Sequence, residues 1–313
     1  MSSSNHFSRG AMAAVFAALV PLSAAQLTTS CNPMNGSQFP CPADAGLCQT
    51  STHVTDFTTG DDSNWRAADG TNLKYTSDGA EFTIADRYQA PTIETDFYIF
   101  YGRVSVAMKS SPGQGIVSSV TLASDVLDEI DWVTRPPPPP PVSIEEQTTT
   151  TDAYPLFIFL QEFLGGNNTM VHSDYFGKGN GTVSDREGDH AVATPVDAWH
   201  TYTIDWTEER IEWIIDDVTV RTLAAADALD GANFPQTPAK VRMGTWAGGD
   251  PAKSYWTRLW AGGDTTYSSE AGMPWTMTVA KVSITNYNPA ESYSYTDGTG
   301  DSGSIAKGGA ACK

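Results

Sequence analysis

Polar and apolar residues alternate along much of the chain, and this pattern predicts β-strands. The alternating runs occupy residues 73–76, 81–84, 92–100, 102–109, 116–122, 170–176, 201–206, 210–215 and 218–223. Turn-forming pairs separate some of them, with Asp78-Gly79 after the first run and Asp216-Asp217 between the last two. Only residues 224–229 have a helical composition. Many short strands with turns between them predict an all-β sandwich or jelly roll.

An acidic stretch follows the run 116–122, which we expect to continue into it. Residues 128–132 read Asp-Glu-Ile-Asp-Trp, with three carboxylates in four positions. In a strand, side chains alternate between faces, so Glu129 and Asp131 would share one face, while Asp128 would share the other with two apolar residues. A solvated strand edge and a catalytic site both fit this pattern.

The composition changes abruptly after Trp132. Six consecutive prolines, a threonine run and an apolar run at 154–160 precede Glu162. A proline run cannot donate the hydrogen bonds of a sheet, so this segment cannot continue the strand. Removing residues 133–161 joins the flanking text into Asp-Glu-Ile-Asp-Trp-Glu-Phe. Glu129, Asp131 and Glu162 then stand at positions i, i+2 and i+4 of one strand.

This restored string resembles the active-site strand of glycoside hydrolase family 16, and the surrounding text resembles the fungal Crh-type cell-wall transglycosylases. The resemblance covers most of the chain after residue 50, at 90–93, 101–104, 115–119, 175–179, 200–206, 246–251 and 286–289. It implies a concanavalin-like β-jelly-roll sandwich and a retaining enzyme without a cofactor or metal. It further implies the transfer of chitin chains to β-glucan. The departure from the family pattern is the insertion.

By the family pattern, Glu129 is the nucleophile, Glu162 the acid/base and Asp131 the helper between them. Four strand residues separate the two Cα atoms by about 13 Å. Glutamate side chains that lean toward each other bring the carboxyls to roughly 5–6 Å, the separation of a retaining glycosidase. Crowding of three acids raises the pKa of at least one, as a general acid requires. Glu145 and Glu146 lack family-like surroundings, and we do not expect either to be the acid/base.

Aromatic and basic residues are candidates for substrate binding. Trp246 and Trp260 each precede Ala-Gly-Gly-Asp, a flexible loop that lets a sugar ring approach an indole, although packing within a hairpin is the alternative. Tyr175 and Phe176 follow the same strand and would line the cleft, with core packing as their alternative. Two basic residues lie in family-like strings and are candidates too, although lone basic residues often only neutralise a carboxylate: Arg103 and His200.

The first 25 residues resemble a secretory signal peptide, with a weakly basic start, an apolar run at 11–22 and a small-residue exit. A buried helix is the alternative. Cleavage before Gln26 would make the mature protein extracellular, where cysteines form disulfides. Four cysteines allow three pairings, of which one joins Cys31 to Cys41 and Cys48 to Cys312; a metal site is a weak alternative. Three sequons predict surface glycosylation, at Asn35, Asn167 and Asn180.

Residues 26–290 fit one large β domain, interrupted by the insertion, and residues 291–313 read as a glycine-, serine- and threonine-rich tail without an apolar anchor. The apolar run 154–160 is too short to span a bilayer. A net charge of −19 argues against nucleic acid and anionic membranes as partners and suits a neutral polysaccharide. We expect a monomer.

Two other functions share these features. One is an endo-β-1,3(4)-glucanase with the same catalytic residues. The other is a wall protein that binds carbohydrate without turnover because of the insertion. We interpret residues 133–161 as a retained intron, since valine codons begin with GT and a glutamine codon can end in AG, with a genuine loop as the alternative. In either case we expect residues 133–161 to leave the sheet and Phe163 to rejoin it.

Overall fold

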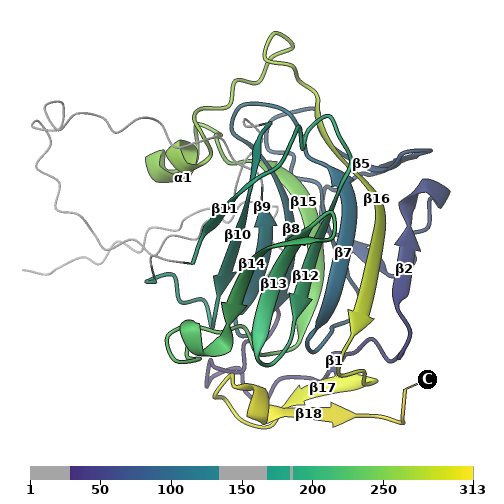
Figure 1. Cartoon of the computed structure of the whole chain (residues 1–313), viewed down its shortest axis with the longest axis vertical. Helices are drawn as coiled ribbons and strands as arrows, with labels where there is room; N and C mark the ends of the chain where they lie inside the picture. Colours follow the sequence, from purple (N-terminus) through teal and green to yellow (C-terminus); the bar gives the residue numbers. More distant parts are fainter. Residues whose placement is uncertain (1–28, 134–167, 184–185, 313) are drawn as a thin grey trace, which may run out of the picture.

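Two antiparallel sheets stack face to face in this protein (Figure 1). The computed structural model describes residues 29–133, 168–183 and 186–312. One sheet has seven strands, in the order β11 (Gly188–Ala191), β10 (Met170–Phe176), β9 (Glu129–Val133), β8 (Ile116–Ser124), β15 (Ala239–Ala247), β6 (Thr92–Thr95) and β3 (Trp65–Ala67). This architecture confirms the predicted all-β sandwich.

The second sheet has eight strands. Its order is β14 (Val218–Ala224), β13 (Arg210–Ile215), β12 (His200–Trp206), β7 (Gly102–Lys109), β16 (Trp275–Asn286), β5 (Gly79–Ile84) and β4 (Lys74–Thr76), with β2 (His53–Asp56) also paired to β16. Asp216 and Asp217 have φ angles of 47° and 64°, so they form the expected tight turn between β13 and β14.

Three local predictions were wrong. The strand that starts at Thr92 ends at Thr95 instead of reaching residue 100. The run 116–122 does not continue into the acidic stretch: β8 ends at Ser124, the chain turns with Leu127 at φ 68°, and β9 returns antiparallel to β8. The helical composition of 224–229 yields only the 3-10 turn η3 (Ala225–Asp227), because its ends pair with neighbouring backbone. The helix α1 (Tyr255–Trp260) was not predicted.

The core lies between the two sheets. Alternate residues of each strand enter it, such as Val104, Val106 and Met108 of β7 in one sheet and Ile130 and Trp132 of β9 in the other. Two indole N–H groups tie the layers together across the core. Trp132 donates to the Thr203 carbonyl at 3.0 Å, and Trp213 donates to the Asp131 carbonyl at 2.9 Å. The backbone of the acidic strand is thereby held from the opposite sheet.

The C-terminal segment is part of the fold, and the prediction of a tail after residue 290 was wrong. Strands β17 (Ser292–Tyr295) and β18 (Ile305–Gly308) form a third sheet with β1 (Asp44–Ala45), and the turn η4 (Ser302–Ser304) precedes β18. Tyr293 is fully buried. Disulfides join Cys31 to Cys41 and Cys48 to Cys312, which is the pairing that the sequence suggested among three. A further short helix, η1 (Phe57–Thr59), follows β2.

Candidate active site

Strand β9 presents its acids on the outer face of the seven-stranded sheet, the face turned away from the eight-stranded sheet. Ile130 and Trp132 enter the core, so Glu129, Asp131 and Val133 point the other way, as the alternation predicts. Residues paired directly across antiparallel strands share a face. Asp131 pairs with Asp174 of β10 on one side and with Thr121 of β8 on the other.

Asp131 is a buried acid beside the expected nucleophile. Its side chain is about 1% exposed, and neither carboxyl oxygen has a hydrogen-bond partner among the described residues. Burial raises the pKa of Asp131 well above its ordinary range, and the neighbouring charge of Glu129 raises it further. The carboxyl of Asp131 therefore retains its proton more readily than an exposed aspartate. This is the raised acid that the sequence predicted for a crowded cluster.

A second buried acid, Asp174, was missed from the sequence. Its carboxylate accepts hydrogen bonds from the Arg186 guanidinium at 3.1 Å to both oxygens, and both side chains are nearly inaccessible. Burial raises the pKa of Asp174 to about 7, although the charge of Arg186 lowers it. Arg186 also lies 4.0 Å above the Phe176 ring, and Phe176 is the cross-strand partner of Glu129. The alternation in 170–176 could have placed Asp174 on this face, but no sequence signal pairs it with Arg186.

Asp128 anchors the start of β9. Its fully buried carboxylate accepts four hydrogen bonds, from the backbone N–H of Lys178, Gln236 and Thr237 and from the Thr237 hydroxyl, at 2.7–3.0 Å. Burial raises the pKa of Asp128, and these hydrogen bonds oppose that effect. The Asp128 N–H in turn donates to Ser124 Oγ at 2.9 Å. Asp128 thus fixes the turn that leads into Glu129.

Val133 ends the strand at the fourth position after Glu129. It was assigned to the insertion, yet it pairs with Ser119 of β8 and His172 of β10 and is 3% exposed. The sheet thus continues one residue beyond Trp132 before the chain departs. Val133 occupies the strand position in which removal of residues 133–161 would put Glu162.

The two candidate tryptophans come together at this end of β9. Trp246 and Trp260 stack with ring centroids 6.4 Å apart and an interplanar angle of 30°. Both are partly buried against a small apolar cluster of Val117, Val133 and Ala261. Strand β15 positions Trp246, and α1 positions Trp260. An indole pair of this kind beside the acids suits a sugar ring.

Comparison with known proteins assigns this arrangement to a family. The profile of the glycosyl hydrolases family 16 matches residues 59–134 and 159–263. The chain belongs to glycosyl hydrolase family 16. It is 46% identical over 92% of its length to Crh-like protein 1 of Aspergillus fumigatus and 45% identical over 94% to Crh-like protein 5 of the same species. It spans 68% and 65% of those two relatives.

Solved structures agree with the family assignment. The chain superposes on an apo Crh5 transglycosylase and on a Crh5 transglycosylase in complex with NAG, each with a TM-score of 0.75. The identities are 42% and 43%, and 89% of this chain and all of that chain are covered. A β-glucanase of Bacillus licheniformis, 21% identical with a TM-score of 0.54, shares the fold. The enzyme class is that of a glycosyl hydrolase or transglycosylase.

The family profile also bears on the insertion. Its match stops at residue 134 and resumes at 159, so residues 135–158 have no counterpart in the family 16 profile. This unmatched stretch lies inside the segment that the sequence analysis set apart. Glu162 falls where the match has resumed.

Three candidate substrate residues lie away from the cleft of this family 16 domain, and those assignments were wrong. Tyr175 is 1% exposed in the main core, because its neighbour Asp174 takes the outer face. Arg103, on β7 of the other sheet, donates to Asp205 at 2.8 Å. His200 begins β12 of that sheet, with its ring nitrogens bound to Asp216 at 2.6 Å and the Ala193 carbonyl at 2.8 Å. Phe176 does face outward, beneath Arg186.

Some assignments lie outside the described residues, namely the signal peptide 1–25, Glu145, Glu146, Glu162, Phe163 and Asn167. Asn35 is exposed and Asn180 partly exposed, and each accepts a hydrogen bond from the hydroxyl of its own sequon. Within the described ranges, no three histidine, cysteine, aspartate or glutamate side chains are placed to hold a metal. Among the same residues, no helix is long and apolar enough to cross a membrane.

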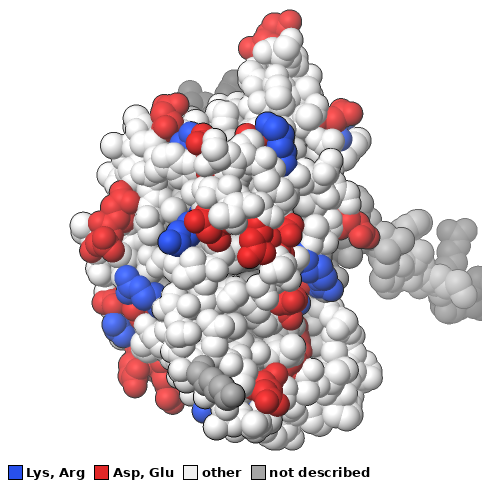
Figure 2. Space-filling model, turned by 90° about the vertical axis from the view of Figure 1, so that its right-hand side faces the viewer, with Lys and Arg blue, Asp and Glu red and all other residues white. Residues whose placement is uncertain are grey.

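The surface charge is mixed and mainly acidic. Figure 2 shows acidic side chains spread over one face of the molecule, with basic side chains mostly beside them and no broad basic patch. Such a face does not attract polyanions.

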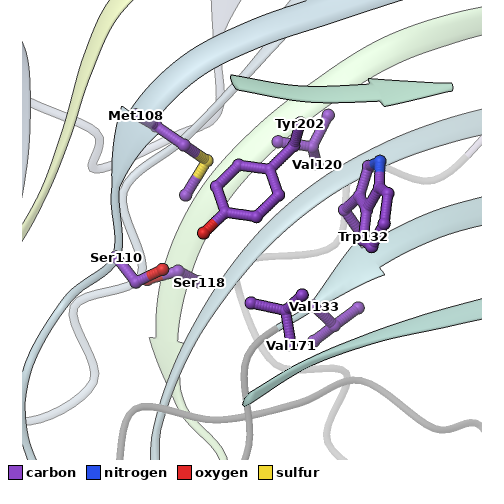
Figure 3. A pocket seen from close by; sticks show the side chains of 8 residues that line it. All are labelled: Met108, Ser110, Ser118, Val120, Trp132, Val133, Val171 and Tyr202. Atoms are coloured by element: carbon purple, nitrogen blue, oxygen red, sulfur yellow. The ribbon is translucent and has the colours of Figure 1, made fainter. Parts of the chain in front are cut away.

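A small cavity lies between the sheets under the end of β9. Its lining includes Val133, Trp132 and Tyr202 (Figure 3). The Tyr202 hydroxyl points toward Ser110 and Ser118 in this view and, among the described residues, has no hydrogen-bond partner. This cavity belongs to the core, and the outer face with Glu129 is the candidate cleft.

Proposed function

We propose that the working form of this protein is a secreted retaining transglycosylase that transfers chitin chains to β-glucan in a fungal cell wall. One observation carries the proposal. Glu129 and the buried Asp131 lie two residues apart on the outer face of β9, and the pKa of Asp131 is raised by burial and by the charge of Glu129. The similarity to a Crh5 transglycosylase solved with NAG supports a substrate that contains N-acetylglucosamine. The protein is expected to act as a monomer.

In this proposal Glu129 attacks the anomeric carbon, and a glycosyl–enzyme bond forms as the bond to the leaving oxygen breaks. Glu162 gives its proton to that oxygen. It then takes the proton of an incoming sugar hydroxyl, which attacks the anomeric carbon and releases Glu129. Asp131 keeps a proton beside Glu129 and thereby limits the negative charge in the cleft. Trp246 and Trp260 would hold a sugar ring by stacking.

The working form is proposed to lack residues 133–161. With Val133 in place, the strand position four residues after Glu129 carries an apolar side chain that can neither donate nor accept a proton. Deleting 133–161 puts a carboxylate there. The gap in the family 16 match between 134 and 159 supports an insertion, for which a retained intron is our explanation.

Sequencing the transcript and the secreted protein tests the intron. A message that joins the codons of Trp132 and Glu162, and an N-terminus at Gln26, are expected. Secreted peptides that contain the proline run would contradict the intron.

A second function applies to the protein if it retains the insertion. Val133 in the acid/base position favours a carbohydrate-binding wall protein without turnover. Both forms, with and without residues 133–161, should be incubated with fluorescent chito- or laminari-oligosaccharides and unlabelled polysaccharide. Transfer of label by the shorter form alone is the expected result. Release of label from laminari-oligosaccharides without transfer would indicate an endo-β-1,3(4)-glucanase instead. Turnover by the longer form would exclude a catalytically inactive wall protein.

A further inference from the structure

Helix α1 carries aromatic side chains from the cleft to the surface. Its last residue, Trp260, packs with Trp246 and Val133 at the end of β9. Its first two residues are Tyr255, 57% exposed, and Trp256, 46% exposed. Large aromatic side chains in water cost free energy, so an exposed pair beside a binding cleft points to a ligand.

The helix aligns two of these side chains. Trp256 and Trp260 are four positions apart, so they lie on the same helix face, separated by about 6 Å along its axis. Trp260 stacks on Trp246, while Tyr255 and Trp256 meet edge to face with centroids 5.2 Å apart. The helix thus places one ring pair, Trp246 with Trp260, at its last residue and the other, Tyr255 with Trp256, at its first two residues.

Both ends of helix α1 are held in place. Ser254 caps its start by accepting the Thr257 N–H at 3.0 Å, and Arg258 forms an ion pair with Asp264 beyond its end. The Gly263 N–H donates to the Arg258 carbonyl at 2.7 Å. A short helix fixed at both ends presents its rings without a large loss of conformational entropy on binding.

We propose that Tyr255 and Trp256 form an outer glycan subsite that binds the polysaccharide chain where it leaves the cleft. The ligand is a neutral β-linked glycan, because it continues the chain bound at Trp246 and Trp260 and because the protein's charge of −19 disfavours anionic partners. Stacking of sugar C–H faces on these rings lengthens the contact with the polymer beyond the cleft. The proposal rests on the proposed function for the occupant of the cleft.

Oligosaccharides of two lengths test it. Binding of three-sugar and six-sugar chito- and laminari-oligosaccharides is measured calorimetrically for the full chain and for the form without residues 133–161. Trp256→Ala is expected to weaken six-sugar binding roughly tenfold and to leave three-sugar binding unchanged, since one stacked ring contributes on the order of 1 kcal/mol. Tyr255→Ala is expected to act in the same direction.

Trp199→Ala is the matched control. Trp199 is 41% exposed, lies against Lys109 at the end of β7 in the other sheet, and should affect neither length. Three outcomes would overturn the outer subsite. They are equal losses of affinity for both lengths, no loss of affinity for either length, and no binding of any oligosaccharide by either form. All of these binding measurements are made in the Glu129→Gln background, which removes the nucleophile, so a failure of the proposed reaction would leave the length dependence intact.

Discussion

Two buried carboxylates on the same face of the seven-stranded sheet are held in opposite ways. One row of directly paired residues crosses that face, in the order Asp174, Asp131, Thr121, Arg242, Glu94 and Arg66. Asp174, at the acidic end, has one guanidinium beside it in the described part of the chain. Glu94, at the other end, is contacted by Arg66, Lys240 and Arg242.

The difference in charge balance sets the protonation of the two acids. Burial raises the pKa of Glu94, but the hydrogen bond of Lys240 and the charges of Lys240 and Arg242 outweigh it, so the net pKa is lowered. For Asp174 burial wins over Arg186, and the pKa rises to about 7. Among the described residues, the nucleophile's end of the sheet therefore has fewer cations beside its carboxylate than the Glu94 end. An excess of acid there retains protons, which general acid catalysis needs.

The largest effect is expected at the acidic end itself. Glu129→Gln keeps the shape of the side chain and removes the nucleophile, so turnover by the form without residues 133–161 should fall on the order of 10³-fold or more. Transfer of fluorescent label measures it, with unchanged melting and oligosaccharide affinity as checks on folding. Glu212→Gln on the opposite sheet is the control. Appreciable residual turnover in Glu129→Gln would move the nucleophile elsewhere.

Removing Arg186, the cation that the described residues place against Asp174, should strongly destabilise the protein. Arg186→Met leaves Asp174 buried without its partner, and the free energy of unfolding should drop by about 3–5 kcal/mol. Urea unfolding at pH 8, above the pKa of Asp174, measures it. A loss below about 1 kcal/mol, the value of an exposed ion pair, would show that Arg186 is not the counter-charge that we describe.

The two carboxylates should impose opposite pH dependences on stability. The pKa of Asp174 is raised from 3.8 to about 7, so its stabilising contribution is present below pH 4 and is lost as the pH rises to 7. The pKa of Glu94 is lowered below 4.5, so its contribution is present above pH 4.5 and is lost as the pH falls.

The test measures the free energy of unfolding of the parent protein and of the variants Asp174→Asn and Glu94→Gln between pH 3 and 8. The value of each variant is subtracted from that of the parent at each pH. The difference for Asp174→Asn should change mainly between pH 4 and 7. The difference for Glu94→Gln should change only below about pH 4.5. Parallel curves would contradict the unequal charge balance.

The smallest effect is expected at the cationic end. Arg66 is 59% exposed, and Glu94 retains Lys240 and Arg242 at 2.8 Å when Arg66 is removed. Arg66→Ala should therefore cost about 1 kcal/mol or less in urea unfolding. A loss as large as that of Arg186→Met would mean that the three cations are not redundant.

Local patterns predicted much of the fold and of β9. The period of two assigned Glu129 and Asp131 to one face and placed most strands, because alternation depends only on neighbouring residues. The alternating pattern failed for residues 96–100, where backbone hydrogen bonds to distant segments end the strand. It also failed at the join between β8 and β9, where the chain turns and the backbone of a distant segment bonds to the turn. The C-terminal residues looked like a tail because their few apolar side chains, such as Tyr293, find their core only in the folded protein.

The sequence by itself determined the acidic motif, the foreign segment after Trp132, the family resemblance and the two tryptophan loops, because each is a property of contiguous residues. Tertiary structure decided which of these meet. It stacked Trp246 on Trp260 beside Val133, buried Tyr175 in the core and moved Arg103 and His200 to the other sheet. It also paired Asp174 with Arg186, since the charge and burial around a carboxylate depend on strands brought together from far apart in the chain.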